Sequence, residues 1–543
     1  MARRITTFSY TKTTFLVITG LVLFRLWYAT SIDLVGDEAQ YWLWSQPFHL
    51  SMSYFSKGPG VAWTIAAGTW LFGESIIGIR FFAIMLAAGT STWLFFLARK
   101  LFDSRTGFWC VIVSSLMPMY AVGSVLMTID PLSVFFWTLA AYFLWKAKDT
   151  DRLWPWVWTG LLIGLGALCK YTNLFQILCF ALFLLACPEY RRHFVRPTFW
   201  LMVITVLVCM TPVILWNMKY DWPTVTHLIH RGGLDQVTVG MDGVSRHNFR
   251  IRPGELFQFF GEQALVISPF IWIGILTAAF LALSTSPVPV VYRFLCALFL
   301  PLMVFYSILS LNENAEANWT APAYIAGVLL GVSIWLQFWK KSVWWRAFAV
   351  LALAVGLFET SVMHVPPAMD WVTQKGLLKK NPMNRLRGWT SLAREVSAQQ
   401  RKHGASFVIA NKYTYASLLS FYMPNQPQTY LPSEVGLNNQ FSFWPDYTDG
   451  FWGYSAIYVS DSPQIPIQLT REFQAVEVLE TFITEDRGRP INTFYFFLCR
   501  DFGATQQVIP LPESLPVTSP KKPAKEKAQK KSPAKPNWKT KER

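Results

Sequence analysis

Apolar segments of about 20 residues recur through the first 364 positions, and they constrain the fold more than any other feature. A helix needs about 20 apolar residues to cross a bilayer. Only 15% of the 543 residues are charged, against about 25% in an average soluble domain. The sequence therefore predicts a polytopic α-helical membrane protein with about 11 spanning helices. We place them at 13–31, 76–98, 106–126, 131–147, 154–170, 173–187, 198–217, 255–283, 293–311, 319–338 and 344–363.

Lysine and arginine gather in every second loop between these segments, and short basic loops stay in the cytoplasm. This pattern predicts a cytoplasmic N-terminus and places the intervening loops outside the membrane. Val61 to Phe72 is apolar but too short to span, so we expect an interfacial helix there. The basic loops contain Arg3, Arg4 and Lys12; Arg99, Lys100 and Arg105; Lys146, Lys148 and Arg152; Arg191, Arg192 and Arg196; Arg293; and Lys340, Lys341 and Arg346.

The composition changes after the last apolar segment, and we divide the chain into a transmembrane domain (1–364), an extracytoplasmic α/β domain (365–510) and a disordered tail (511–543). Strands alternating with helices indicate the α/β class, and no glycine fingerprint for a dinucleotide is present. We expect helices at Thr390–Gln400 and Tyr413–Tyr422, and strands at Ser406–Ala410, Ala456–Ser460, Val476–Thr484 and Asn492–Leu498.

The tail is rich in Pro, Ala and Lys and has too little apolar surface to fold. From Lys521 to Arg543 it carries ten Lys or Arg against two Glu, about half of the net charge of +16. Either it lies on anionic lipid or it only keeps the protein soluble. Because the charge is concentrated in the tail and in loops on one side of the membrane, we expect no nucleic-acid partner.

Acidic and basic residues stand in the loops that this topology places outside the membrane. Asp37 and Glu38 follow the first apolar segment, Lys57 follows in the same loop, and Asp130 joins two later segments. A solvated carboxylate pair is the common alternative, but charges beside apolar segments usually line a polar cavity. A carboxylate there takes a proton from an attacking hydroxyl or amine. A cation neutralises a leaving phosphate, so the set suits group transfer from a lipid phosphate.

Two of these loops have simpler explanations that the sequence leaves open. Asp130 precedes Pro131 and has the position of a helix N-cap. His227 and His230 stand three residues apart, but no third ligand has a clear spacing, so we expect a solvated helix face. The seven cysteines show neither metal-ligand spacing nor a disulfide framework. We predict no metal and no cofactor.

Four motifs in register resemble those of the GT-C glycosyltransferases. The branch they resemble contains the dolichyl-phosphate-mannose protein mannosyltransferases and the bacterial aminoarabinose transferase of lipid A. The similarity covers about residues 13–340, and the stretch from Asn318 to Tyr324 is similar to the family's late loop. The motifs are Asp37-Glu38-Ala39-Gln40-Tyr41-Trp42, Tyr54-Phe55-Ser56-Lys57-Gly58-Pro59, Leu71-Phe72-Gly73 with Gly78-Ile79-Arg80-Phe81, and Met127-Thr128-Ile129-Asp130-Pro131.

The resemblance implies inverting transfer of a sugar from a polyprenyl-phosphate carrier, on the periplasmic face of the bacterial inner membrane. The acceptor is expected to be an envelope glycolipid such as a lipopolysaccharide component, with a protein hydroxyl as the second choice. For Arg80 a snorkelling residue at the interface is the alternative. The resemblance assigns Asp37, Glu38 and Asp130 to catalysis, and Lys57, Arg80 and Tyr54 to the donor phosphate.

The chain departs from the family pattern in the Lys57 motif, so the donor sugar and the acceptor stay open. Lys57-Gly58-Pro59 stands where many relatives have a histidine and two prolines, and Ser56 replaces an acid of the aminoarabinose branch. A transporter or flippase for lipid-linked saccharides is the rival class. Transporters tend to show internal repeats and broken helices, and no clear repeat is present. A non-catalytic envelope scaffold is the third possibility.

Overall fold

The computed structural model describes residues 9–232, 237–239, 245–247, 251–312, 315–378, 380–433 and 439–503. The predicted tail, 511–543, lies outside the described residues. Most of the first 364 positions are helical, as expected. The helices are α1 (Tyr10–Ala29), α2 (Gly36–Ser45), α3 (Gly60–Phe72), α4 (Ile76–Leu101), α5 (Ser104–Ser115), α6 (Pro118–Gly123), α7 (Ile129–Ala147), α8 (Leu153–Cys169), α9 (Phe175–Ala186), α10 (Pro197–Lys219), α11 (Pro223–Arg231), α12 (Pro253–Ile267), α13 (Pro269–Ser284), α14 (Val290–Leu309), α15 (Tyr324–Phe338) and α16 (Val343–His364).

Each predicted spanning segment contains helix, but two of them are broken. Segment 106–126 divides into α5 and α6 before Pro118, and segment 255–283 divides into α12 and α13, which bend by 108° before Pro269. Proline lacks the N–H donor and clashes with the preceding helical turn, so a helix is interrupted before a proline. Within the described residues, six helices are long and apolar enough to cross a membrane, or seven with the bent pair. The chain is a helical membrane protein, and the number eleven stays a prediction.

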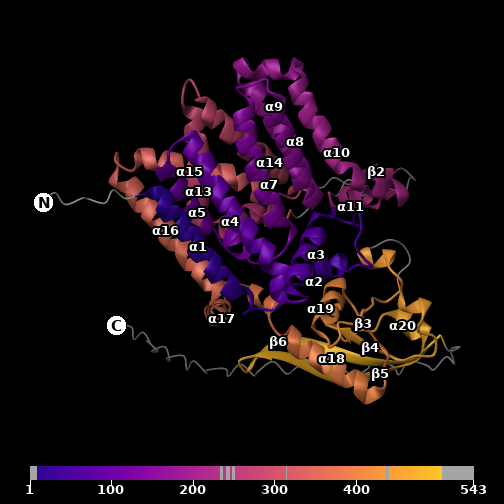
Figure 1. Cartoon of the computed structure of the whole chain (residues 1–543). Helices are drawn as coiled ribbons and strands as arrows, with labels where there is room; N and C mark the ends of the chain where they lie inside the picture. Colours follow the sequence, from indigo (N-terminus) through magenta and orange to yellow (C-terminus); the bar gives the residue numbers. More distant parts are fainter. Residues whose placement is uncertain are drawn as a thin grey trace, which may run out of the picture. The chain divides into compact units, whose positions relative to one another are not determined.

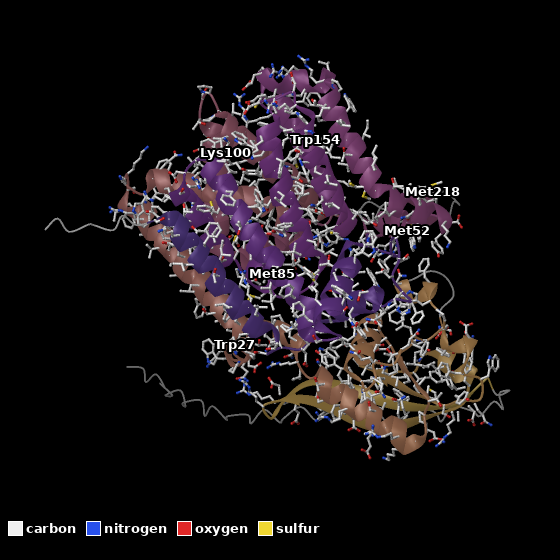
Figure 2. The ribbon with its side chains drawn as sticks, in the orientation of Figure 1. Trp27, Met52, Met85, Lys100, Trp154 and Met218 are labelled. Carbon is white, nitrogen blue, oxygen red and sulfur yellow. The ribbon has the colours of Figure 1, made fainter. Side chains whose placement is uncertain are left out.

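The helices form a bundle with a small sheet at one end (Figure 1). In Figure 2, Trp27 lies at the end of the bundle near the sheet and Lys100 lies toward the opposite end. The last turn of helix α4 contains Arg99 and Lys100. Cations in this position are stabilised by the negative end of the helix dipole. The basic end of α4 and the sheet therefore lie at opposite ends of the bundle.

The C-terminal region contains a four-stranded sheet with helices, and its predicted elements are confirmed. The strand order is β3-β4-β6-β5; β3 pairs with β4 in parallel, and the other two pairings are antiparallel. A separate two-stranded ribbon follows α11. The elements are α17 (Pro366–Gln374), α18 (Trp389–His403), α19 (Tyr413–Tyr422), α20 (Ile467–Glu472), β1 (Val237–Val239), β2 (Ser245–His247), β3 (Phe407–Ala410), β4 (Ala456–Ser460), β5 (Phe473–Asp486) and β6 (Arg489–Phe502).

The sheet region shares one hydrophobic core with the loops at this end of the bundle. Trp42 of α2 and Ile65 of α3 belong to the same buried cluster as Leu392 of α18, Leu418 of α19 and Phe496 of β6. Burial of such side chains is worth about 1.5–3 kcal/mol each. The core fixes α2 against α19, and this contact positions the site described below. The domain division at residue 365 stays a prediction.

Candidate active site

Helix α2 begins against the sheet region and carries both acids of the first motif. A Cβ on Gly36 would lie 2.6 Å from the Thr414 side chain of α19, so only glycine allows this approach. Asp37 and Glu38 occupy the first turn, where the helix dipole favours negative charge. Neighbouring positions of a helix point about 100° apart, so the two carboxylates face different surroundings.

Glu38 forms a fully buried ion pair with Arg80 of α4. Neither side chain is exposed. The Arg80 Nε and Nη2 donate to Glu38 Oε1 and Oε2 at 2.8 and 2.6 Å, and the remaining N–H groups donate to the carbonyls of Ala29, Ile32 and Asp33. All five donors of the guanidinium are thus used.

The same carboxylate also fixes two other segments. Glu38 accepts from the backbone N–H of Val35 at 3.1 Å and of Met127, in the α6–α7 link, at 2.8 Å. The pair therefore joins the end of α1, the start of α4 and the segment before α7. This geometry does not support direct phosphate binding by Arg80, which has no donor left. The snorkelling alternative is also wrong, because the side chain is buried.

Asp130 lies in the first turn of α7 but does not cap it. The Thr128 hydroxyl is the N-cap acceptor, so the capping prediction for Asp130 is wrong and its carboxylate is available for other contacts. Lys170 Nζ, at the end of α8, donates to Asp130 Oδ1 at 2.6 Å, and Asn318 Nδ2 donates to Oδ2 at 2.8 Å. Lys170 also donates to the Asn318 carbonyl at 3.1 Å. These contacts bring together three loops that are far apart in the sequence.

The Lys57 loop packs against the end of α8. The Lys57 carbonyl accepts from Tyr54 N at 3.0 Å, which closes the turn. A Cβ on Gly58 would lie 2.2 Å from the Leu168 carbonyl oxygen, so a larger residue would push the loop away. This approach places the Lys57 and Lys170 charges close enough to affect each other.

Tyr54 supports this loop from inside and has no exposed surface. Its ring stacks on Trp44 with centroids 4.3 Å apart, and its hydroxyl donates to the Trp44 carbonyl at 2.8 Å. The hydroxyl also accepts from Ser51 N at 3.1 Å. The geometry therefore favours a supporting role for Tyr54 over a direct contact with the donor phosphate.

The side chains of Asp37 and Lys57 make no hydrogen bond or ion pair with any described residue, unlike those of Glu38, Arg80, Asp130 and Lys170. Asp37 has exposed surface, but the protein that surrounds its carboxylate limits the hydration of that group. This partial loss of hydration, followed by the Glu316 charge, raises the pKa of Asp37 above its usual value. Burial lowers the pKa of Lys57, and the positive charge of Lys170 lowers it further. Both groups are thus available to a reactant.

A cavity of about 820 Å³ reaches the site from the bundle. Asp130, Asn318 and Arg385 belong to its lining, and the Arg385 charge also acts on Asp37. The other charged residues of the lining are Arg25, Glu359 and Lys380. The rest of the lining is mainly apolar and comes from α4–α7, α12 and α15–α17. Binding sites of this kind are typically apolar with a few polar groups that fix orientation.

Four further polar residues of the site were not predicted: Lys170, Glu316, Asn318 and Arg385. Lys170 ends an apolar segment on the side opposite to the basic loops, and such a charge beside a membrane segment is a functional signal. Glu316 and Asn318 belong to a loop whose contact with Asp130 only the fold reveals. Among the described residues, no group of three or more His, Cys, Asp or Glu side chains is arranged to hold a metal ion.

Comparisons with known proteins identify the class of enzyme. Residues 56–216 match the dolichyl-phosphate-mannose-protein mannosyltransferase family. The lipid A galacturonosyltransferase RgtD of Rhizobium johnstonii is 27% identical over 435 residues, which cover 78% of this chain and 86% of that protein. The chain is a membrane glycosyltransferase.

Two further similarities extend the comparison. The undecaprenyl phosphate-alpha-4-amino-4-deoxy-L-arabinose arabinosyl transferase of Pseudomonas aeruginosa is 33% identical over 132 residues, 23% of this glycosyltransferase and 24% of that protein. The crystal structure of ArnT from Cupriavidus metallidurans superposes with a TM-score of 0.59 at 15% identity, covering 90% of this chain and 98% of that one. The glycosyltransferase therefore has the ArnT fold over most of its length.

Proposed function

We propose that this glycosyltransferase transfers a sugar from undecaprenyl phosphate to lipid A or another lipopolysaccharide component, with inversion, on the periplasmic face of the bacterial inner membrane. The observation that carries the proposal is the pair of charges Asp37 and Lys57, which interact electrostatically with each other. The Arg385 charge acts on Asp37 and the Asp130 charge acts on Lys57, and both of these residues line the mainly apolar cavity. The similarity to RgtD and to the arabinosyl transferase supports the donor and acceptor classes. The predicted topology, with eleven spanning helices and the sheet region outside, fits this placement.

In the proposed reaction, the Asp37 carboxylate takes the proton of an acceptor hydroxyl. The oxygen attacks the anomeric carbon from the face opposite the phosphate, and the bond between that carbon and the phosphate oxygen breaks. Lys57 neutralises the charge that grows on the leaving polyprenyl phosphate. The cavity holds a lipid chain, and the Asp130–Lys170 ion pair forms part of the wall of the site. Glu38, Arg80 and Tyr54 hold these loops in place.

Mass spectrometry of lipid A from cells with and without the gene tests the proposal. We expect a lipid A species carrying one additional sugar that disappears on deletion and returns with the wild-type gene. Complementation with an Asp37→Asn gene serves as the control and should restore no modified species. Identical envelope lipids in all three strains would contradict the proposal.

Removing the Lys57 charge should slow transfer without unfolding the protein. We expect Lys57→Ala to lower kcat/KM by about 10²–10³-fold, as for other lost electrostatic contacts to a developing charge. Lys57→Arg should retain part of the activity, because it restores the charge with a different geometry. Steady-state kinetics with varied donor checks this expectation. The exposed Lys375→Ala is the matched control, and an equal loss there would remove Lys57 from the mechanism.

The pH profile should move in a defined direction when Glu316 is neutralised. Transfer needs Asp37 deprotonated and Lys57 protonated, so activity falls below the pKa of Asp37 and above that of Lys57. The Glu316 charge raises the pKa of both groups. Glu316→Gln should therefore shift both limbs of the kcat/KM profile to lower pH. Limbs that stay in place, or move in opposite directions, would contradict these electrostatics.

A further inference from the structure

The outer sheet region contains a second pocket, of about 440 Å³, that the reaction described above does not use. It lies at the carboxyl ends of the parallel strands β3 and β4, where α/β sheets commonly bind ligands. Asn411 follows β3 and Tyr458 belongs to β4. The Asn411 backbone N–H donates to the Val459 carbonyl at 3.1 Å, which fixes this residue at the sheet edge. The pocket is therefore built on rigid strand ends.

The polar groups of the pocket are only partly used within the protein. Asn411 Nδ2 donates to Asp461 at 2.7 Å, but Asn411 Oδ1 is buried and has no hydrogen-bond partner among the described residues. An unsatisfied buried oxygen is destabilising, and a hydrogen bond from a ligand donor would satisfy it. Lys412 Nζ contacts Asp461 and keeps further donors free. Asn439 and Gln468 add two more amides to the lining.

The pocket is adjacent to Asp37. Thr414 lines the pocket and contacts Gly36, the residue before Asp37. Tyr413 also lines it, is partly exposed, and has its pKa raised by burial and by the charges of Asp37 and Glu316. Asp37 thus interacts electrostatically with one lining residue of each space: Arg385 of the mainly apolar cavity and Tyr413 of this pocket. This arrangement suits a lipid in the cavity and a hydrophilic substrate in the pocket.

We propose that this pocket binds the saccharide of the acceptor glycolipid and presents its hydroxyl to Asp37. Amide side chains pair with neighbouring sugar hydroxyls, the Tyr413 ring offers an apolar face, and Lys412 suits a phosphate or carboxylate on the sugar. The ligand class is a phosphorylated saccharide. The inference rests on the proposed function, since it names where that reaction's acceptor binds.

The test separates acceptor binding from donor binding and chemistry. The double variant Asn411→Ala/Gln468→Ala removes two amides. Each hydrogen bond is worth about 0.5–1.5 kcal/mol, so we expect the KM for lipid A to rise about tenfold. The KM for the donor and kcat at saturating acceptor should stay unchanged. Gln464→Ala, at an exposed amide in the β4–α20 loop outside the pocket lining, is the control. An unchanged acceptor KM, or an equal rise in the control, would overturn the inference.

A binding measurement distinguishes failure of the pocket from failure of the proposed function. Saturation-transfer NMR on the full-length protein in detergent uses a water-soluble phosphorylated glucosamine disaccharide as the probe. We expect signal with the wild type and its loss in the double variant, whether or not the wild type transfers sugar to lipid A. Absence of signal from the wild type, or equal signal from both proteins, would overturn the pocket assignment.

Discussion

Replacing Asp37 by Asn is expected to lower kcat by about 10²–10⁴-fold, the range that general-base catalysis contributes. The amide keeps the shape of the side chain but does not accept the acceptor proton. Because Asp37 makes no hydrogen bond or ion pair with a described residue, the variant should keep the wild-type melting temperature. Steady-state kinetics and thermal unfolding in detergent measure the two quantities. Wild-type turnover by a folded Asp37→Asn protein would exclude Asp37 as the base.

The neighbouring substitution, Glu38→Gln, is expected to act on stability instead. It leaves the Arg80 charge buried with no opposite charge in direct contact, and breaking a buried pair in this way costs about 3–5 kcal/mol. It also weakens the links to Val35 and Met127 that hold three segments together. We expect a markedly lower melting temperature, with any remaining folded protein retaining transfer. Thermal unfolding of both variants in the same detergent provides the comparison.

Two adjacent carboxylates thus serve as controls for each other. Asp37→Asn should lose activity and keep stability, and Glu38→Gln should lose stability. If Glu38→Gln has the wild-type melting temperature and is inactive, Glu38 belongs to the catalytic machinery. The structural role assigned to Glu38 would then be wrong.

The helical part of the fold was largely predictable, because apolar length is a local property. The breaks were less visible: Pro118 and Pro269 stand inside apolar runs that composition alone joins into single segments. Six elements after residue 365 were predictable from their apolar pattern, but the helices α17 and α20 were not predicted. The hairpin of β5 and β6 also continues beyond the predicted strands into exposed residues.

The site was predictable only in part. Asp37 and Lys57 followed from the motifs, but the ion pair between Glu38 and Arg80 joins positions 42 residues apart. Its geometry depends on how α1, α2 and α4 pack, which no local pattern encodes. Lys170 was assigned to the end of a spanning segment, and its partnership with Asp130 appears only when α7 and α8 lie side by side. The catalytic roles themselves stay predictions.

Reconstitution of the purified protein in liposomes, with an undecaprenyl-phosphate-linked sugar and lipid A, tests the central claim most directly. We expect a glycosylated lipid A with inverted anomeric configuration and one molecule of undecaprenyl phosphate released for each sugar transferred. Movement of the donor across the bilayer without any glycosylated product would contradict it.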